Sequence, residues 1–149
     1  MLIQKGADIN AQGGFYGNAL QAASAKGHLK IVEMLIQNGA DINAPGGVYG
    51  NALYAASLYR YLEIAEMLIQ KGADINAQGG AYGHALQAAS AEGYLEIAQI
   101  LIQKGADINA QGGHYGHALH AASAGGHLKI AEMLIQKGAD VNAQGKGMT

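Results

Sequence analysis

The chain has 149 residues, of which 50% are hydrophobic, and its 9 basic and 11 acidic residues give a net charge of -2 at pH 7. Because the two signs are interspersed, the composition excludes the extended positive field with which proteins bind nucleic acid or anionic lipid. The absence of cysteine excludes disulfides and thiolate metal sites and fits a reducing compartment, so we expect a cytoplasmic protein. We recognise no export signal and no apolar run of the roughly 20 residues that a membrane span requires.

One segment recurs along the chain at a period of 33 residues. GGFYGNALQAAS at Gly13 returns with few changes at Gly46, Gly79 and Gly112, and the full copies keep the same residue at 18 of 33 positions. A period of this length marks a supersecondary unit that stacks on copies of itself, since one copy buries too little apolar surface to fold alone. We therefore expect a single domain over 1–149, made of a half repeat 1–14, full repeats 15–47, 48–80, 81–113 and 114–146, and a stub 147–149.

The first full copy predicts two helices and an extended loop. Asn18 is suited to cap a helix over ALQAASAK, and Gly27 is suited to close it in the left-handed conformation. A second helix is predicted from Leu29 to the residue before Gly39, because its apolar residues recur at helical spacing. The segment that follows, GADINAPGGVYG, has paired glycines and predicts a projecting finger with a tight tip.

These segments carry a resemblance to a known family. GADINA, GHLKIVEMLIQ and ALQAAS at this period resemble the ankyrin repeat, whose unit reads TPLHxAAxxGHxxVVxLLLxxGADVNA, over nearly the whole chain. The resemblance implies an all-α ankyrin-repeat solenoid of stacked helix-turn-helix units with hairpin-like fingers at a right angle to the helices. It implies that the concave surface of fingers and first helices binds other proteins, without catalysis or cofactor. The finger segment GGxYGNALQAAS resembles, more narrowly, ankyrin arrays at the ends of fungal NACHT-type receptor proteins.

The copies depart from the family pattern where each first helix begins. The family's Thr-Pro pair is replaced by Asn-Ala in the first two full copies, at Asn18 and Asn51, and by His-Ala in the last two, at His84 and His117. Because His is a weaker cap than Asn or Thr, we expect the first helices of the last two copies to begin less firmly.

Positions that differ among near-identical copies are predicted to be released from stacking and exposed on one shared face. Neutral drift on a solvated surface is the alternative to a role in binding. The candidate partner-binding residues are Phe15, Val48, Ala81 and His114 at the finger tip, Asn18, Asn51, His84 and His117 at the cap, Gln21, Tyr54, Gln87 and His120 in the first helix, and Lys26, Leu58, Tyr59, Arg60 and Glu92 at its end.

The second full copy differs most from the others. It gathers Tyr54, Leu58 and Tyr59, and amphipathic aromatic residues often contribute about 2 kcal/mol or more each to an interface, so we predict that this cluster is the anchor. Arg60 replaces a glycine that the other copies keep, and a left-handed conformation there costs about 1–2 kcal/mol. A strained functional site and a rearranged turn remain the two interpretations.

Histidine and serine are the remaining candidates for chemistry. His84, His114, His117 and His120 are expected near one another, but no cysteine accompanies them, so ordinary surface histidines are favoured over a zinc site. His28 and His127 are expected to support the backbone of the helix-helix turn. A serine recurs in every first helix, which favours packing over a single prepared nucleophile. We predict no metal and no catalytic residue.

An asparagine also recurs in every finger segment. It resembles the finger asparagines that asparaginyl hydroxylases modify in ankyrin arrays, whereas the favoured interpretation is that its side chain braces the turn by bonding to nearby backbone. These residues are Asn10, Asn43, Asn76, Asn109 and Asn142.

Together the patterns predict a non-catalytic module that recognises a protein partner of unknown identity, as the sensor part of a larger receptor. A rival function is structural. The chain starts inside a second helix and lacks the helix that would cover Leu2 and Ile3, which indicates either a fragment of a longer array or end-to-end self-association. The similarity of the copies is typical both of recent duplication and of consensus design.

Overall fold

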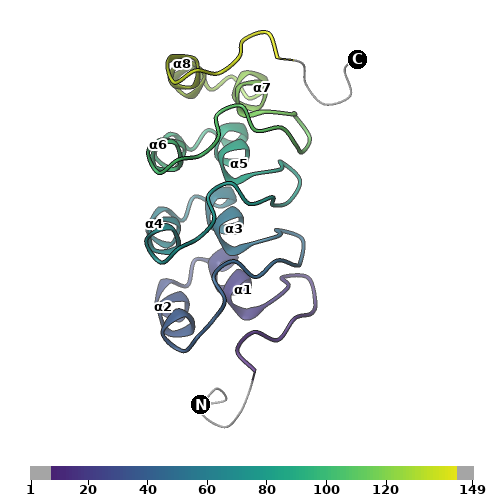
Figure 1. Cartoon of the computed structure of the whole chain (residues 1–149), viewed down its shortest axis with the longest axis vertical. Helices are drawn as coiled ribbons and strands as arrows, with labels where there is room; N and C mark the ends of the chain where they lie inside the picture. The colour runs from purple at the N-terminus through teal and green to yellow at the C-terminus, as the bar shows by residue number, and fades with distance from the viewer. Residues whose placement is uncertain (1–7, 144–149) are drawn as a thin grey trace. The chain divides into compact units, whose positions relative to one another are not determined.

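The computed structural model describes residues 8–143, and its helices come in pairs (Figure 1). Within these residues there are eight helices, and extended pairing is limited to isolated bridges, which confirms the predicted all-α class of stacked helix-turn-helix units. Leu2, Ile3 and the stub 147–149 lie outside the described residues. The helices are α1 (Ala19–Lys26), α2 (Leu29–Gln37), α3 (Ala52–Leu58), α4 (Leu62–Gln70), α5 (Ala85–Glu92), α6 (Leu95–Gln103), α7 (Ala118–Ala124) and α8 (Leu128–Gln136).

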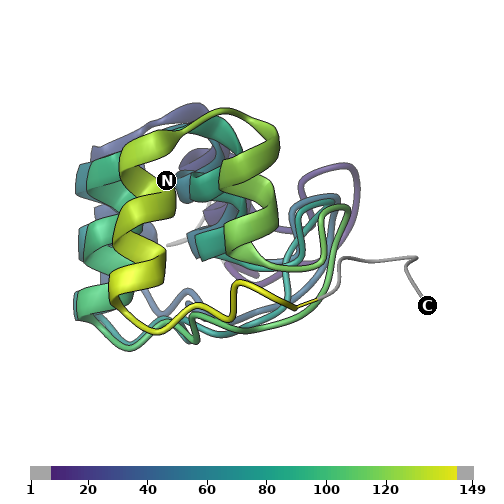
Figure 2. The same ribbon diagram turned by 90° about the horizontal axis from the view of Figure 1, so that it is seen from above.

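The chain divides into two compact units, a first unit that ends at Asp74 and a second unit that begins at Ile75. In the first unit α1 packs against α3, and each of them packs against the second helix of its own pair. The second unit repeats this arrangement with α5 and α7. Within each unit the loops that follow the second helices turn back and project beyond the first helices as fingers (Figure 2). None of the helices in the described part of the chain has the length and hydropathy needed to cross a bilayer.

The core of each unit is the apolar stripe of the second helices packed on the alanine-rich first helices. Ala55 and Ala56 are fully buried, and such small side chains let neighbouring helices approach closely. Each buried aliphatic side chain contributes about 1.5–3 kcal/mol, so the helical spacing found in the sequence is the main stabilising feature. The buried stripe residues are Val32 and Leu35, Ile64 and Leu68, Ile97 and Leu101, and Ile130 and Leu134.

The first helices begin with different caps in the two units. The side-chain oxygen of Asn18 accepts a hydrogen bond from the Gln21 amide at 2.9 Å, and Asn51 does the same for the amide of Tyr54 at 2.8 Å. The corresponding His84 and His117 make no side-chain capping bond. The weaker capping expected for histidine is confirmed, although α5 and α7 start at the same place in the repeat as α1 and α3.

The fingers are closed at their tips and joined to one another within each unit. The Gly13 amide donates to the Gly17 carbonyl at 2.9 Å, and the same bond closes the tip of each later finger. The Val48 amide donates to the Phe15 carbonyl in the first unit, as His114 does to Ala81 in the second, at 2.9 Å in both. Adjacent tips therefore form one hydrogen-bonded edge in each unit.

The recurring asparagines connect successive repeats. In the first unit Asn10 accepts a hydrogen bond from the Asp41 amide at 2.7 Å, and its amide group donates to the Gly39 carbonyl at 3.3 Å. Asn43, Asn76 and Asn109 make the same pair of bonds, each to the backbone that follows the next helix pair. We expected these asparagine side chains to bond to the backbone of their own turn. That expectation is wrong, because they bond to the backbone of the next repeat. Aspartates brace that turn, for example where Asp41 accepts from the Asn43 amide.

Candidate functional site

The variable positions at the finger tips and at the ends of the first helices are exposed, as the sequence predicts. Phe15 is 59% exposed, Val48 47% and Tyr59 43%. The other exposed candidates are Lys26, Arg60, Ala81, Glu92 and His114, while Asn18, Leu58, His84 and His120 are half-buried. These positions remain candidates for contact with a partner.

The variable row inside the first helices is buried, so the exposure that we expected for it is wrong. Gln21, Tyr54 and Gln87 are each only 1–2% exposed. Gln21 donates to the Ala44 carbonyl at 3.3 Å, and Gln87 donates to the carbonyls of Ala110, Gly112 and Gly116 at 2.9–3.3 Å. The physical reason is that a side chain in this row points into its unit and, as glutamine, reaches the backbone of the next finger.

Two of the cap positions, Asn51 at 7% and His117 at 4% exposure, are also buried against our expectation. Asn51 turns its oxygen toward the first turn of its own helix, at the Tyr54 amide. The ring of His117 packs edge-to-face on His120, with centroids 4.3 Å apart. A buried Tyr54 cannot present its ring as the predicted anchor, so the exposed part of that cluster is Tyr59.

Five aromatic rings form a row over the surface of the first unit, from the finger tip to the turn between α3 and α4. Neighbouring ring centroids lie 5.0–6.5 Å apart, mostly in edge-to-face or tilted geometry, which is the favourable range for aromatic pairs. We call this row the aromatic ridge. It consists of Phe15, Tyr16, Tyr49, Tyr59 and Tyr61.

The middle of the ridge is fixed by a hydrogen bond between the hydroxyls of Tyr49 and Tyr59. Burial, and then this bond, raise the pKa of Tyr49 to about 12. The Tyr49 hydroxyl therefore stays neutral at physiological pH, and its bond to Tyr59 holds the exposed Tyr59 ring in place. Sequence comparison among the copies missed Tyr16 and Tyr49, because the same tyrosine is present in every finger and was assigned to stacking. The sequence does contain an indication of this cluster, because every finger has a tyrosine and one repeat adds further tyrosines to its own.

Two cations accompany the ridge. The ammonium of Lys26 lies 5.8 Å from the centroid of the Tyr16 ring, within reach of a cation-π interaction. A hydrogen bond with Tyr16 raises the pKa of Lys26, so the Lys26 ammonium stays protonated at physiological pH. Arg60 has a φ of 66°, the one positive φ outside glycine among the described residues. Of the two interpretations left open by the sequence, the structure therefore has the left-handed conformation that the glycines of the other copies also adopt, and not a rearranged turn.

A groove of about 410 Å³ adjoins the ridge at Tyr61. Its walls combine aliphatic, aromatic and charged side chains and come from the turn after α1, the start of α2, the turn after α3 and the start of α4. A Cβ on Gly27 would lie 2.6 Å from the Tyr61 ring, so only glycine lets that ring sit there. The residues that line the groove are Gly27, Leu29, Arg60, Tyr61, Leu62, Glu63 and Ile64.

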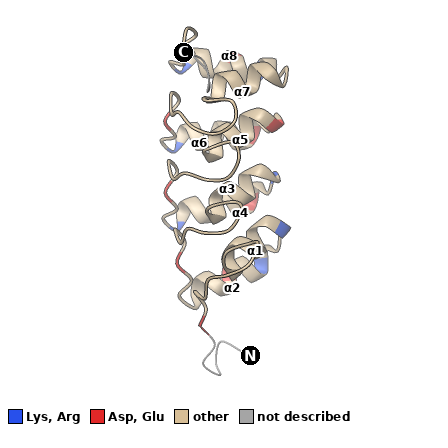
Figure 3. Cartoon of the chain, turned by 90° about the vertical axis from the view of Figure 1, so that its right-hand side faces the viewer, with Lys and Arg blue, Asp and Glu red and all other residues tan. Residues whose placement is uncertain are grey.

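The corresponding surface of the second unit has a different chemistry. The rings of Tyr82 and Tyr115 stack at 6.0 Å with 7° between their planes, and the His114 ring packs on Tyr115. The Tyr82 hydroxyl donates to the Glu92 carboxylate at 3.1 Å, and burial together with this bond raises the pKa of Tyr82. Figure 3 shows basic residues at the end of α1 and acidic residues at the end of α5.

Several of the histidines bond to neighbouring groups of the protein. His84 bonds to the Gln87 side chain at 2.7 Å, and His127 bonds to the Ala91 carbonyl at 3.0 Å, which confirms the backbone-supporting role predicted for His127. Between residues 8 and 143 no three histidine or acidic side chains are placed to hold a metal ion. Ser24, Ser57 and Ser90 are fully buried, as the packing interpretation requires, whereas Ser123 of the last copy is exposed and departs from it.

A comparison with models of protein families matches the chain to the model described as ankyrin repeats (3 copies), over residues 1–79 and 81–145. No curated protein matches the chain significantly.

Proposed function

The chain belongs to the ankyrin repeat family, and from this premise we propose that it is a non-catalytic module that recognises a protein partner through its fingers and the ends of its first helices. Ankyrin repeats are protein-protein interaction modules. The observation that carries the assignment of the surface is the aromatic ridge, since it exposes Phe15 on a glycine-rich finger and Tyr59 at the end of α3.

The ridge has the properties of an interface anchor. Exposed tyrosine and phenylalanine offer a large contact area at low entropic cost, and residues of this kind often contribute about 2 kcal/mol or more each to binding. The Tyr49–Tyr59 hydrogen bond and the ring contacts hold the side chains before a partner arrives, which lowers the ordering cost of association. Tyr54, which is buried, has no part in this proposal.

The experiment is a quantitative comparison of partner recovery by the parent chain and by the double variant Phe15→Ala, Tyr59→Ala. The matched control is Ile31→Ala, because Ile31 is 45% exposed on α2 of the same unit and lies outside the ridge. We expect the double variant to recover at least about tenfold less partner than the parent, which corresponds to about 1.4 kcal/mol of binding free energy. The control should recover as much partner as the parent. Equal recovery by all three proteins would contradict the proposed surface.

End-to-end self-association is the second candidate function. It is favoured by exposed apolar side chains on and after α8, where Leu128 is 68% exposed, Ile135 49% and Val141 59%. Light scattering over a concentration series tests it. If the chain self-associates, the apparent molecular mass rises with protein concentration, and Leu128→Ser makes that rise smaller. A mass that stays constant would exclude it. The sensor role within a receptor and the cytoplasmic location stay predictions.

A further inference from the structure

The ridge and the groove together form one continuous track on the first unit. The ridge begins at the finger tip with Phe15, passes the Tyr49–Tyr59 pair, and ends at Tyr61, which is also a wall of the groove. Aliphatic side chains of Leu29 and Leu62 line the groove next to it. A row of rings that leads into a small apolar groove fits an extended chain with one apolar side chain inserted, better than it fits a folded surface.

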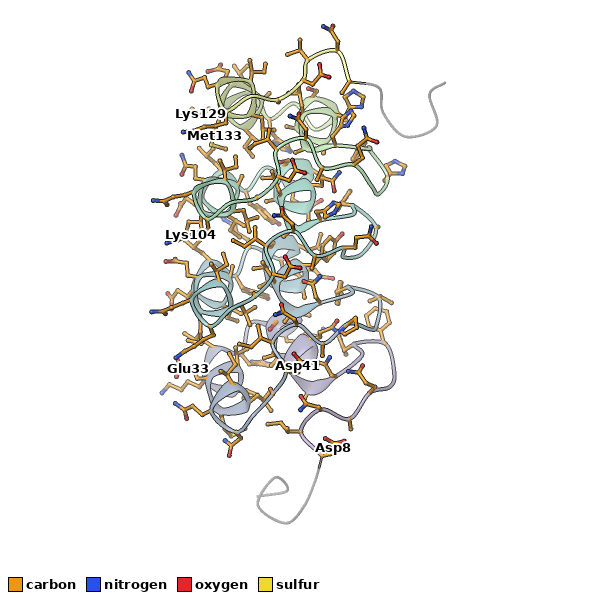
Figure 4. The ribbon with its side chains drawn as sticks, in the orientation of Figure 1. Asp8, Glu33, Asp41, Lys104, Lys129 and Met133 are labelled. Atoms are coloured by element: carbon orange, nitrogen blue, oxygen red, sulfur yellow. The ribbon has the colours of Figure 1, made fainter. Side chains whose placement is uncertain are left out.

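Charge determines what kind of chain this track attracts. Lys26 lies at the ridge beside Tyr16, and Arg60 lines the groove. Most acidic residues of the first unit lie elsewhere. Glu33 is on α2, at the side away from the fingers (Figure 4), and Asp41 accepts a hydrogen bond from the Asn43 amide in the loop that follows α2. Glu63 is the exception, since it lines the groove with Arg60.

We propose that this track binds an acidic, extended segment of a partner protein, an inference that rests on the proposed function. Carboxylates of the segment pair with the Lys26 ammonium and the Arg60 guanidinium, and accept hydrogen bonds from tyrosine hydroxyls of the ridge. Apolar side chains of the segment cover Phe15 and Val48, and one occupies the groove.

A single-stranded nucleic acid is the competing ligand for a surface of aromatic rings and cations. The observations favour the peptide. The ridge has two cations, Lys26 and Arg60, which limits the number of phosphates that it neutralises. Nucleic-acid binding gains most of its affinity from many such neutralised phosphates.

The test selects a displayed library of random linear peptides on the full chain and then measures the enriched peptides by fluorescence anisotropy. We expect enrichment of Asp and Glu around an apolar residue, and affinity that falls as salt is added. Lys26→Glu weakens binding by at least about tenfold, because it replaces an attraction with a repulsion. The matched control is Lys71→Glu, which makes the same charge change at an exposed residue after α4 and alters affinity by less than about twofold.

The other outcomes separate this inference from the proposed function. Peptides that depend on Phe15 and Tyr59 but show no acidic excess would leave the recognition function standing and overturn the acidic specificity. Peptides that bind the Phe15→Ala, Tyr59→Ala variant as well as the parent would count against both. Failure to enrich any peptide, or tighter binding of a single-stranded oligonucleotide to the same residues, overturns the inference. Circular dichroism of each variant checks that it is folded.

Discussion

At the ends of their first helices the first unit carries Lys26 and Tyr59, and the second unit carries Glu92 and Gly125 at the same places in the repeat. The helix pairs, the finger closure and the asparagine bonds are alike in both units. The surfaces nevertheless differ, since one unit has an aromatic ridge with cations and the other has stacked tyrosines bonded to a carboxylate. The comparison teaches that a few variable side chains on a constant scaffold set the chemistry of each unit.

The largest effect is expected at the second glycine of the finger, where a finger that packs on the preceding one differs from a finger with open space beside it. Gly113 has a φ of 70°, and its Cβ would lie 2.1 Å from the carbonyl carbon of Tyr82, whereas Gly14 has a φ of 72° and open space around it. Gly113→Ala adds a clash to the left-handed strain and is expected to lower the free energy of unfolding by about 3 kcal/mol. Gly14→Ala is expected to cost about 1 kcal/mol. Urea denaturation measures both, and equal losses would show that contact between neighbouring fingers is unimportant.

The asparagine bonds are the next test. Asn43 makes two hydrogen bonds to the backbone that follows the next helix pair, so Asn43→Ala is expected to lower the free energy of unfolding by about 1–2 kcal/mol. Asn142 is exposed, and its backbone amide donates a hydrogen bond to the carboxylate of Asp140. Asn142→Ala is therefore expected to change stability by less than about 0.5 kcal/mol. A loss at Asn142 as large as at Asn43 is incompatible with a role in joining repeats.

Exchanging Arg60 with the glycine at the same place in the second unit tests how much the left-handed backbone costs. Arg60 holds a φ of 66°, while Gly126 holds 73° at the same place in the second unit, with open space where a Cβ would be. Arg60→Gly is expected to raise the free energy of unfolding by about 1 kcal/mol, and Gly126→Arg to lower it by a similar amount. Thermal unfolding of the two variants gives the signs directly. A less stable Arg60→Gly variant would show that contacts of the arginine outweigh its backbone strain.

The smallest expected effect is a change in pH dependence at the ridge. The pKa of Tyr49 is raised to about 12 by burial and by its bond to Tyr59, against about 10 for a free tyrosine. A raised pKa of an acid means that the folded state favours the neutral form. The resulting stabilisation is therefore complete below about pH 10 and is lost as the pH rises toward 12.

Absorbance of tyrosinate tests this expectation. One late component in the titration of the parent should disappear in Tyr49→Phe, and the stability of that variant should fall less steeply above about pH 10. Tyr16→Phe is a control in the same ridge, because no hydroxyl pair is broken. If all tyrosines titrate together near their usual pKa, the Tyr49–Tyr59 bond is absent in solution.

Much of the fold could be predicted from the residues because it depends on local rules. Asn18 and Gly27 bound α1 as expected, and the apolar spacing of α2 identified Val32 and Leu35 as buried. Each of these features is decided by residues within a few positions of one another, so a single repeat contains the information.

Comparison of the copies could not tell which variable residues are exposed. Tyr54 varies and is buried, whereas the constant finger tyrosine Tyr16 is partly exposed and belongs to the ridge. Variation between copies therefore does not distinguish a solvent-facing position from one that repacks against the next finger. The row of Gln21 and Gln87 shows the same failure, because its hydrogen bonds reach carbonyls more than twenty residues away.

The amino-acid sequence by itself determined the repeat, its two helices, its caps and its finger, because period, capping chemistry and glycine conformation act over short stretches of chain. The tertiary structure alone decided that Phe15, Tyr49 and Tyr61 join into one surface and that Tyr54 does not. The contact between Phe15 and Tyr49 depends on how one repeat is placed against the next. That placement sets the distance between side chains more than thirty residues apart, and no local pattern encodes it.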